Sequence, residues 1–324
     1  MKERWVPAYA LPMSADEPKP IVAMTQVPGY APAQLDESVA RLLEASGLAL
    51  ATGAHVLVKP NLVAARGARH STTHPEVVRA VCAYLLDCGA RVTVADSPAF
   101  GPASQVARAS GLADALAGLG LKVAGMTRPV PLPLTRGGHI GISRDALEAQ
   151  AIINLPKLKV HCQMVMTGAV KNLFGCVVGF RKAVAHHTMG DDPRTFTSML
   201  MDVYAALPRT HHLMDGVEAL HRDGPTGGDP FRLGLLAASD NGVALDTAAY
   251  TVLGLEPGQV PLWQEAVTRN MGGADPHGLA YPLDTPERFD ATGFAMAPES
   301  PIKFEPVRLL KGRVRSLLKH FTKS

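Results

Sequence analysis

Short apolar runs alternate along most of the chain with segments in which apolar residues recur at helical spacing. The helical spacing occurs within residues 32–46, 74–88 and 193–207, whereas short Val-rich stretches typical of strands occupy 55–58 and 91–95. Strands that alternate with helices in this way are typical of a mostly parallel sheet with helices on both faces. We therefore predict an α/β fold, arranged either as one body or as two lobes around a cleft.

Turn and cap signals mark the ends of several elements. Thr73 can cap the helix within 74–88, Pro75 suits its first turn, and Gly89 ends it. Gly111 interrupts the helix expected over 102–119. Further strands are expected at 21–26, 121–126, 151–155, 211–214 and 233–238, and further helices at 165–177, 245–253 and within 260–270.

The stretch 128–150 is rich in Pro and Gly and breaks this alternation, which predicts a linker or lid. It separates an N-terminal α/β lobe over 20–127 from a second α/β lobe over 151–272. Residues 273–324 are expected to form an irregular segment and a basic C-terminal tail. The tail could contact an acidic partner or an anionic membrane surface through an amphipathic helix, or it could be a solvated chain end.

Composition and charge narrow the class of protein. The chain has 324 residues, of which 47% are hydrophobic and 19% are charged, so it can bury a large core. A net charge of +3 supplies no overall field for nucleic acid. The first residues lack an apolar signal core, and no apolar run reaches the roughly 18 residues of a transmembrane segment. We therefore expect a cytoplasmic protein.

Polar residues follow predicted strands four times. Each could be an ordinary turn, but ligands of parallel sheets bind beyond the carboxyl ends of the strands. Four such placements favour one shared cleft over four independent turns. The residues are Lys59 and Asn61 after 55–58, Asp96 and Ser97 after 91–95, Lys157, Lys159 and His161 after 151–155, and Asp215 after 211–214.

Lys157, Lys159 and His161 share one side if their segment is extended, because side chains alternate along a strand. Two ammonium groups and an imidazole in a row suit a carboxylate or phosphate, and His161 can exchange protons near neutral pH. The alternative is an exposed edge with solvated lysines. Pro156 and the apolar neighbours favour the anion site.

Lys171 and Asn172 lie in an otherwise apolar segment. A desolvated Lys171 would have a lowered pKa, which suits a base or a lysine that forms a Schiff base. An ion pair with Asp96 or Asp215 is the alternative. For Cys176, a buried structural thiol is favoured over a nucleophile or cluster ligand.

Thr73 and His74 open a predicted helix, whose N–H groups could bind an anion, although a helix cap alone also explains Thr73. The four cysteines form no C-x-x-C pair and lack zinc or ferredoxin spacing. His186 and His187 lie on an expected loop, where adjacent histidines rarely reach one ion. The candidate metal ligands are therefore limited to His186, His187 and Cys176, and no cofactor is predicted from spacing.

A set of motifs in a fixed order covers roughly residues 20 to 270. They are Val58–Asn61, Thr72–Glu76, Ala95–Pro98, Asn154–His161, Gly168–Cys176, Asp215-Gly216 and Gly224-Pro225. Together they resemble a bacterial and archaeal family known as the domain of unknown function numbered three-six-two. The resemblance implies a fold but no reaction.

Two departures from the family pattern accompany the resemblance. Members often carry a C-terminal ferredoxin module with two iron–sulfur clusters, and this chain lacks those cysteines. Members also commonly have a Met-Glu-Gly run before the Gly-Pro, and here His221 stands at the acidic position. The family is distantly similar in architecture to lactate-racemase-like proteins, but a shared fold says little about function.

These observations predict an enzyme that binds a small carboxylate- or phosphate-bearing substrate in a cleft lined by Lys and His. Its proton-transfer chemistry would be that of an isomerase, racemase or lyase. The alternatives are an iron–sulfur-linked redox protein, based on the family and on Cys162 and Cys176, and a non-catalytic metabolite-binding protein. The candidate catalytic residues are His161, Lys171, Asp96 and Asp215, and the candidate substrate-binding residues are Lys59, Asn61, Thr73, His74, Lys157, Lys159 and Asn172.

Overall fold

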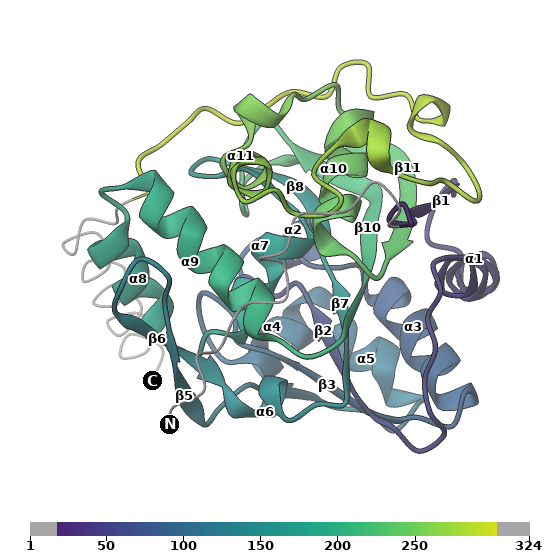
Figure 1. Ribbon diagram of the computed structural model, residues 1–324. Helices are drawn as coiled ribbons and strands as arrows, with labels where there is room; N and C mark the ends of the chain where they lie inside the picture. The colour runs from purple at the N-terminus through teal and green to yellow at the C-terminus, as the bar shows by residue number, and fades with distance from the viewer. Residues whose placement is uncertain (1–17, 303–324) are drawn as a thin grey trace, which may run out of the picture.

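The computed structural model describes residues 18–302, which are built around one sheet with helices on both faces (Figure 1). Seven strands lie side by side in the order β1-β11-β10-β7-β2-β3-β4, and β8 and β9 continue the sheet beside β10. The strands are β1 (Ala23–Gln26), β2 (His55–Pro60), β3 (Arg91–Asp96), β4 (Val123–Gly125), β7 (Ala151–Leu155), β8 (Lys157–His161), β9 (Val165–Thr167), β10 (Thr210–His221) and β11 (Asp229–Ser239).

The sheet is mostly parallel, which confirms the predicted fold class. β2 pairs in parallel with β3 and β7, β3 pairs with β4, and β10 pairs with β7 and β8. Among the described residues, the antiparallel pairs of this sheet are β1 with β11, β10 with β11 and β8 with β9. Strands from both expected lobes, 20–127 and 151–272, pair within this one sheet, and the domain boundaries stay a prediction.

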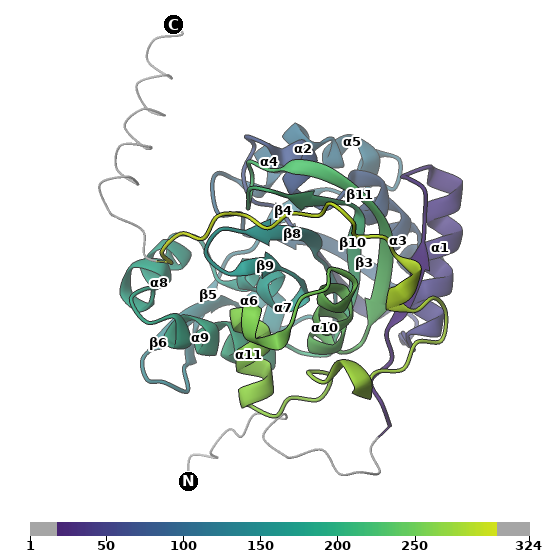
Figure 2. The same ribbon diagram turned by 90° about the horizontal axis from the view of Figure 1, so that it is seen from above.

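Helices cover the two faces as separate layers, which are seen from above in Figure 2. Alternation along β2 shows how the layers arise, because Val56 and Val58 enter one apolar core and Leu57 enters the other. The first core contains α1 (Pro32–Ala45), α3 (Pro75–Asp87), α4 (Ala103–Ser110) and α5 (Leu112–Ala117); the second contains α7 (Ala169–Asn172), α8 (Arg181–Met189), α9 (Pro193–Ala206), α10 (Gly242–Val252) and α11 (Pro261–Thr268).

Local sequence signals account for several helix boundaries, but the predicted N-cap residue of one helix is wrong. Gly111 adopts φ 84° and separates α4 from α5, as the sequence predicts. The N-cap of α3 is His74, whose Nδ1 accepts a hydrogen bond from the Glu76 amide at 3.2 Å. The Thr73 hydroxyl does not cap the helix, because it donates to the Leu155 carbonyl at 2.6 Å.

Three expected elements differ in the structure. The helix expected over 165–177 is replaced by strand β9, the single turn α7 and a 3₁₀ helix at Leu173–Cys176. The stretch 128–150 forms a hairpin of β5 (Pro129–Pro133) and β6 (His139–Ser143), followed by α6 (Arg144–Leu147). Asp215 lies in the middle of β10 and not after a strand.

No helix among residues 18–302 is long and apolar enough to cross a membrane. The basic tail predicted near the C-terminus lies outside the described residues.

Candidate functional site

Five lysines gather where β2, β3 and β8 meet α7 and α8. Lys59, Lys157, Lys159 and Lys182 are between 0 and 8% exposed, and Lys171 is half-buried. The alternative of an exposed edge with solvated lysines is therefore wrong for Lys157 and Lys159. Buried ammonium groups need partners, so the contacts of each lysine show which charges are balanced.

Lys59 forms a buried ion pair with Asp96, and Nζ lies 3.0 Å from Oδ1. The other Asp96 oxygen accepts a hydrogen bond from the Leu62 amide at 2.9 Å. Gly175 packs directly against this pair, because a Cβ there would lie 2.3 Å from Asp96 Oδ1 and 2.5 Å from Lys59 Nζ. The motif glycine thus brings the 3₁₀ helix up to the ion pair.

A second buried pair joins Lys157 to Asp215, with Nζ 2.9 Å from Oδ2. The Tyr30 hydroxyl accepts from Lys157 and donates to Asp215 Oδ1, both at 2.9 Å. His74 stacks on the Tyr30 ring with a centroid distance of 3.5 Å, and its backbone amide donates to Asp215. Burial lowers the pKa of His74, although Asp215 opposes this shift.

Lys159 and Lys182 are buried without a carboxylate partner in residues 18–302. Lys159 donates to Asn61 Oδ1 at 3.1 Å and to the Ser71 carbonyl at 2.6 Å, while Lys182 donates to the Ser97 carbonyl. Burial lowers the pKa of Lys159 strongly, with Lys171 as the next cause, and lowers the pKa of Lys182 to about 8. These cations are therefore only partly compensated.

Lys171 makes no hydrogen bond or ion pair with any residue that the structure describes. Burial lowers its pKa to about 8. The predicted alternative, an ion pair with Asp96 or Asp215, is not formed, because those carboxylates pair with Lys59 and Lys157.

His161 lies next to the unpaired lysines. Its Nδ1 accepts a hydrogen bond from the Gln163 amide at 3.1 Å, so the ring hydrogen of the neutral imidazole sits on Nε2. Burial lowers the His161 pKa well below its ordinary value, and Lys171 and Lys159 lower it further. The ring is therefore neutral near pH 7, with its hydrogen on Nε2 and its one lone pair, on Nδ1, occupied by the Gln163 amide.

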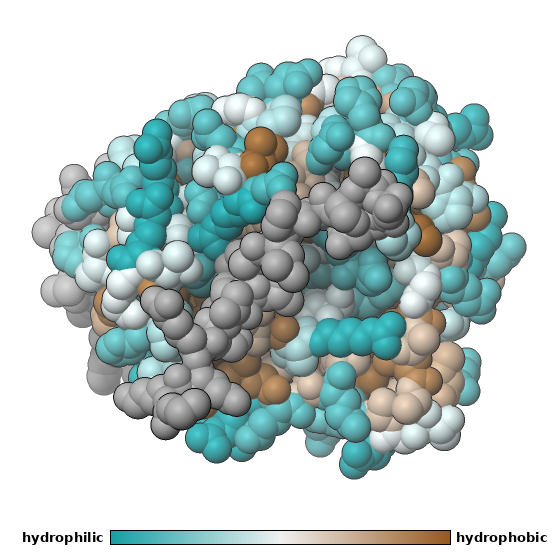
Figure 3. Space-filling model, in the orientation of Figure 1, coloured by the Kyte–Doolittle hydropathy of each residue, from teal (hydrophilic) through white to brown (hydrophobic). Residues whose placement is uncertain are grey.

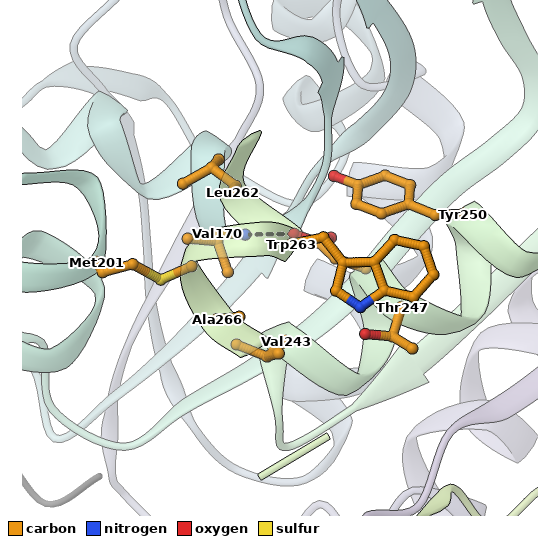
Figure 4. A pocket seen from close by; sticks show the side chains of 9 residues that line it. Val170, Met201, Val243, Thr247, Tyr250, Leu262, Trp263 and Ala266 are labelled. Carbon is orange, nitrogen blue, oxygen red and sulfur yellow. Dashed lines mark hydrogen bonds between the residues drawn. The ribbon is translucent and has the colours of Figure 1, made fainter. Parts of the chain in front are cut away.

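Asp246 on α10 holds the start of α7, although the sequence analysis did not select it. Its carboxylate accepts hydrogen bonds from the Ala169 and Val170 amides, the second at 3.1 Å. The dashed line at Val170 in Figure 4 marks the second of these bonds. Burial raises the Asp246 pKa to about 7. Its carboxylate borders a cavity of about 10 Å³ lined by Val170, Met201, Val243, Asp246, Thr247, Tyr250, Leu262, Trp263 and Ala266.

We expect Gly168→Ala to lower the free energy of unfolding by about 1–3 kcal/mol, because the site has no room for a methyl group. A Cβ on Gly168 would lie 2.1 Å from Asp246 Oδ1 and would displace the carboxylate from the start of α7. Gly118→Ala is the matched control, since nothing lies within 4 Å and φ is −63°. Urea unfolding of both variants measures the difference, and equal stabilities would contradict the steric account.

The remaining substrate-binding candidates have structural partners. Asn61 accepts from Lys159, and its amide donates to Thr73 Oγ1 at 2.8 Å. Asn172 Nδ2 donates to Asn154 Oδ1 at 2.8 Å. Of the set, only Lys159 and Lys171 combine proximity to His161 with the lack of a carboxylate partner.

The three candidate metal ligands do not converge. His186 and His187 lie in helix α8 and not in the expected loop; His186 packs against Phe174 and Phe196, and His187 is exposed. Cys176 is buried, and burial raises its pKa to about 12. Within residues 18–302, no three His, Cys, Asp or Glu side chains are placed to hold a metal ion. This donor set does not fit an iron–sulfur cluster.

His221, which stands at the family's acidic position, lies in an aromatic cluster. Its ring centroid is 5.2 Å from that of Phe231 and 5.6 Å from that of Phe294. Its Nδ1 accepts from the Ala295 amide at 3.3 Å. The side chain therefore anchors the segment around residue 295.

That C-terminal segment runs beside the turn after β8 and reaches α8 (Figure 2). The Ser300 amide donates to the Cys162 carbonyl at 2.6 Å, and Gln163 Nε2 donates to the Pro301 carbonyl at 2.8 Å. The segment thus covers the strand end that carries His161.

A larger hollow of about 410 Å³ lies away from the lysines. It is lined by Pro20, Pro257, Val267, Asn270, Met271, Gly273, Ala274, Asp275, Pro276 and Gly278. The face of the molecule in Figure 3 is predominantly polar. Neither this hollow nor the cavity beside Asp246 is lined by any of the five lysines.

The fold and the site define an α/β protein with a buried lysine cluster at the carboxyl edge of its sheet. The chain belongs to the family described as domain of unknown function DUF362, whose model matches residues 56–251. A relative from Synechocystis named "Thylakoid-associated protein" is 36% identical over 318 residues, which cover 93% of this chain and 94% of that protein.

Two solved structures are similar over part of the chain. The lactate racemase apoprotein from Thermoanaerobacterium thermosaccharolyticum has a TM-score of 0.47 and 13% identity, and the match covers 75% of this chain and 59% of that one. A Thermotoga maritima protein has a TM-score of 0.42 and 12% identity, and the match covers 61% of this chain and 53% of that one. Likenesses at this level carry no argument about function.

Proposed function

We propose that this protein is an enzyme that binds a small carboxylate- or phosphate-bearing substrate and moves a proton on it. The observation that carries the proposal is the charge imbalance of the cluster. Five lysines face two paired carboxylates, which leaves Lys159, Lys171 and Lys182 without an acidic partner in the described chain. An anionic ligand would supply the missing charge and recover part of the desolvation free energy of these cations.

The roles follow from the contacts of each residue. Lys159 binds the anionic group, and the neutral His161 ring next to Lys171 takes the proton on Nδ1 in place of the Gln163 hydrogen bond. Lys171 is half-buried and marks the side from which the ligand enters. Asp96 and Asp215, both expected to be catalytic, serve in this proposal to hold Lys59 and Lys157 in place.

Anion binding is tested by thermal unfolding in a panel of phosphate esters and 2-hydroxy and amino acids. A ligand at 100 times its Kd is expected to stabilise the protein by about 2.7 kcal/mol. Lys159→Met should abolish the stabilisation, whereas Lys122→Met, at an exposed lysine, should preserve it. Equal stabilisation of both variants, or none by any anion, would refute the proposal.

Proton transfer is tested separately by NMR detection of hydrogen exchange in deuterium oxide. A substrate should exchange its hydrogen at the carbon next to the carboxylate, and His161→Gln should slow the exchange by about 10²-fold or more. Tight ligands that never exchange would instead favour the non-catalytic metabolite-binding function.

Association with an anionic membrane surface is a second candidate function, favoured by the name of the Synechocystis relative. The basic residues of the tail would supply the attraction. Co-sedimentation of the full chain with phosphatidylglycerol vesicles, but not with phosphatidylcholine vesicles, would support it. Unchanged binding after Lys311, Arg313 and Arg315 are replaced by glutamine would count against it.

A further inference from the structure

Lys171 differs from the other four lysines of the cluster because its amine is uncommitted. Lys59 forms an ion pair with a carboxylate, Lys157 donates to one, and Lys159 and Lys182 donate to carbonyl groups. Lys171 has no such partner in residues 18–302, and it is the one half-buried residue of the five. Its amine is therefore not committed to any protein group that the structure describes.

The backbone around this amine is held on both sides. Before it, the Ala169 and Val170 amides donate to the buried Asp246 carboxylate. After it, Asn172 donates through Nδ2 to Asn154 Oδ1 at 2.8 Å. A side chain with a fixed base and an unpaired terminal group has the arrangement expected of a nucleophile.

Two features of the surroundings favour attack by the Lys171 amine on a carbonyl group: a lowered pKa and a nearby hydrogen-bond donor. Burial lowers the Lys171 pKa to about 8, so a substantial fraction of the amine is neutral near physiological pH. His161 Nε2 carries a hydrogen, because Nδ1 accepts from Gln163, and this hydrogen has no acceptor among the described residues. Lys159 has no carboxylate partner among the described residues and would bind an anionic group of the substrate.

We propose that Lys171 forms a Schiff base with the carbonyl carbon of an oxo acid whose anionic group is bound by Lys159. The inference rests on the proposed function, because it uses the same anion site. It adds the substrate class, a carbonyl compound that carries a negative charge, and the covalent role of Lys171.

The step balances without an oxidant or reductant. The Nζ lone pair forms a C–N bond as the carbonyl π bond breaks onto oxygen. That oxygen takes one proton from the attacking nitrogen and a second from solvent, while His161 Nε2–H donates a hydrogen bond to it, and it leaves as water with its bonding electrons. The nitrogen keeps one hydrogen and becomes a protonated imine. The imine withdraws electrons from the adjacent carbon, which makes a hydrogen there easier for a base to remove.

Reductive trapping tests the inference on the full-length protein. The chain is incubated with sodium cyanoborohydride and glyoxylate, pyruvate or 2-oxoglutarate, and adducts are mapped by peptide mass spectrometry. At least one oxo acid should label Lys171 about ten-fold or more over the exposed Lys122, because the bound carbonyl is held beside the amine. Acetone, a neutral ketone, should show no such preference.

Two variants decide the assignment. Lys171→Arg should remove the selective adduct, and Lys122→Arg should leave it unchanged. Labelling of Lys171 should also rise through about pH 8, as its pKa requires. Adducts spread evenly over surface lysines, or an undiminished total in Lys171→Arg, would overturn the inference.

The outcomes separate this inference from the proposed function. If an oxo acid raises the melting temperature and Lys159→Met abolishes the rise, yet no adduct forms on Lys171, the Schiff base is wrong and the anion site stands. If no anion of either panel binds and no adduct forms, both are wrong. Normal thermal unfolding of Lys171→Arg shows that a lost adduct does not reflect misfolding.

Discussion

Asp96→Ala is expected to lower the free energy of unfolding by about 3–5 kcal/mol, because it strands a fully buried ammonium group. Lys59 is 0% exposed and would keep only the Pro60 carbonyl, 3.2 Å from Nζ, as an acceptor. The Leu62 amide would also lose its acceptor. Urea unfolding followed by circular dichroism measures the loss.

Two companion variants show whether charge is the cause. Lys59→Met combined with Asp96→Asn removes both charges with little change of shape, and it should recover at least half of the loss. Asp229→Ala removes the partner of Arg222 in an ion pair that is 64% and 63% exposed, so it should cost about 1 kcal/mol or less. If Asp96→Ala costs no more than Asp229→Ala, Lys59 is not held as a buried cation.

The result bears on the role of Asp96. A catalytic carboxylate would lose activity in the isosteric Asp96→Asn variant even when the protein remains folded. A carboxylate that balances Lys59 would instead show activity that follows stability across these variants. The close fit of Gly175 against the pair favours the second account.

The sequence predicted the sheet because its strands are short stretches rich in apolar residues and bounded by turn residues. β2 and β7 are buried on both faces, and β3 is buried over its second half, so they read as Val- and Ile-rich segments. The prediction of one helix over 165–177 was wrong because the apolar residues there are placed by packing against other elements and not by a helical repeat. Gly168 and Gly175 lie where a side chain would strike Asp246 or the Lys59–Asp96 pair, so tertiary packing and not helical period sets this segment.

The candidate site was only partly visible in the sequence. Polar residues after apolar runs pointed to Lys59, Asp96, Lys157 and Lys159. Which lysine lacks a partner depends on pairings between distant strands, and no local pattern encodes these.

Three residues near the site were missed for different reasons. Lys182 lies in a basic segment that reads as a solvated face, and Tyr30 reaches Asp215 only because the sheet brings the two together. Asp246 could have been found, because it is the one carboxylate in the otherwise apolar segment of α10. A lone acid in an apolar helix signals a buried partner.

Acid should destabilise the protein more than its surface charges would suggest. Burial lowers the pKa of His186 and His211 to about 4 and that of His212 to about 3. The unfolded chain binds protons on these rings below about pH 6.5, whereas the folded chain does not until lower pH. Stability from these groups is therefore complete above pH 6.5 and is lost as pH falls.

Asp246 opposes this trend without cancelling it. Its pKa is raised to about 7, so the folded state holds a proton that the unfolded state has lost, and its contribution rises as pH falls from 7 towards 4. Between pH 7 and pH 4, each of the three histidines lowers the free energy of unfolding by about 3 kcal/mol. Asp246 raises it by about as much as one histidine lowers it. The net loss between pH 7 and pH 4 is expected to be on the order of 5 kcal/mol.

Adjacent histidines provide the matched test of this acid sensitivity. His186 is 7% exposed, whereas His187, the next residue of α8, is exposed. Urea unfolding at pH 7, 5.5 and 4 and constant ionic strength should show a smaller loss for His186→Gln than for the parent chain. His187→Gln should follow the parent chain, because the exposed side chain of His187 stays in contact with water in both the folded and the unfolded state. A stability that is flat across this range would mean that the buried rings gain access to protons without unfolding.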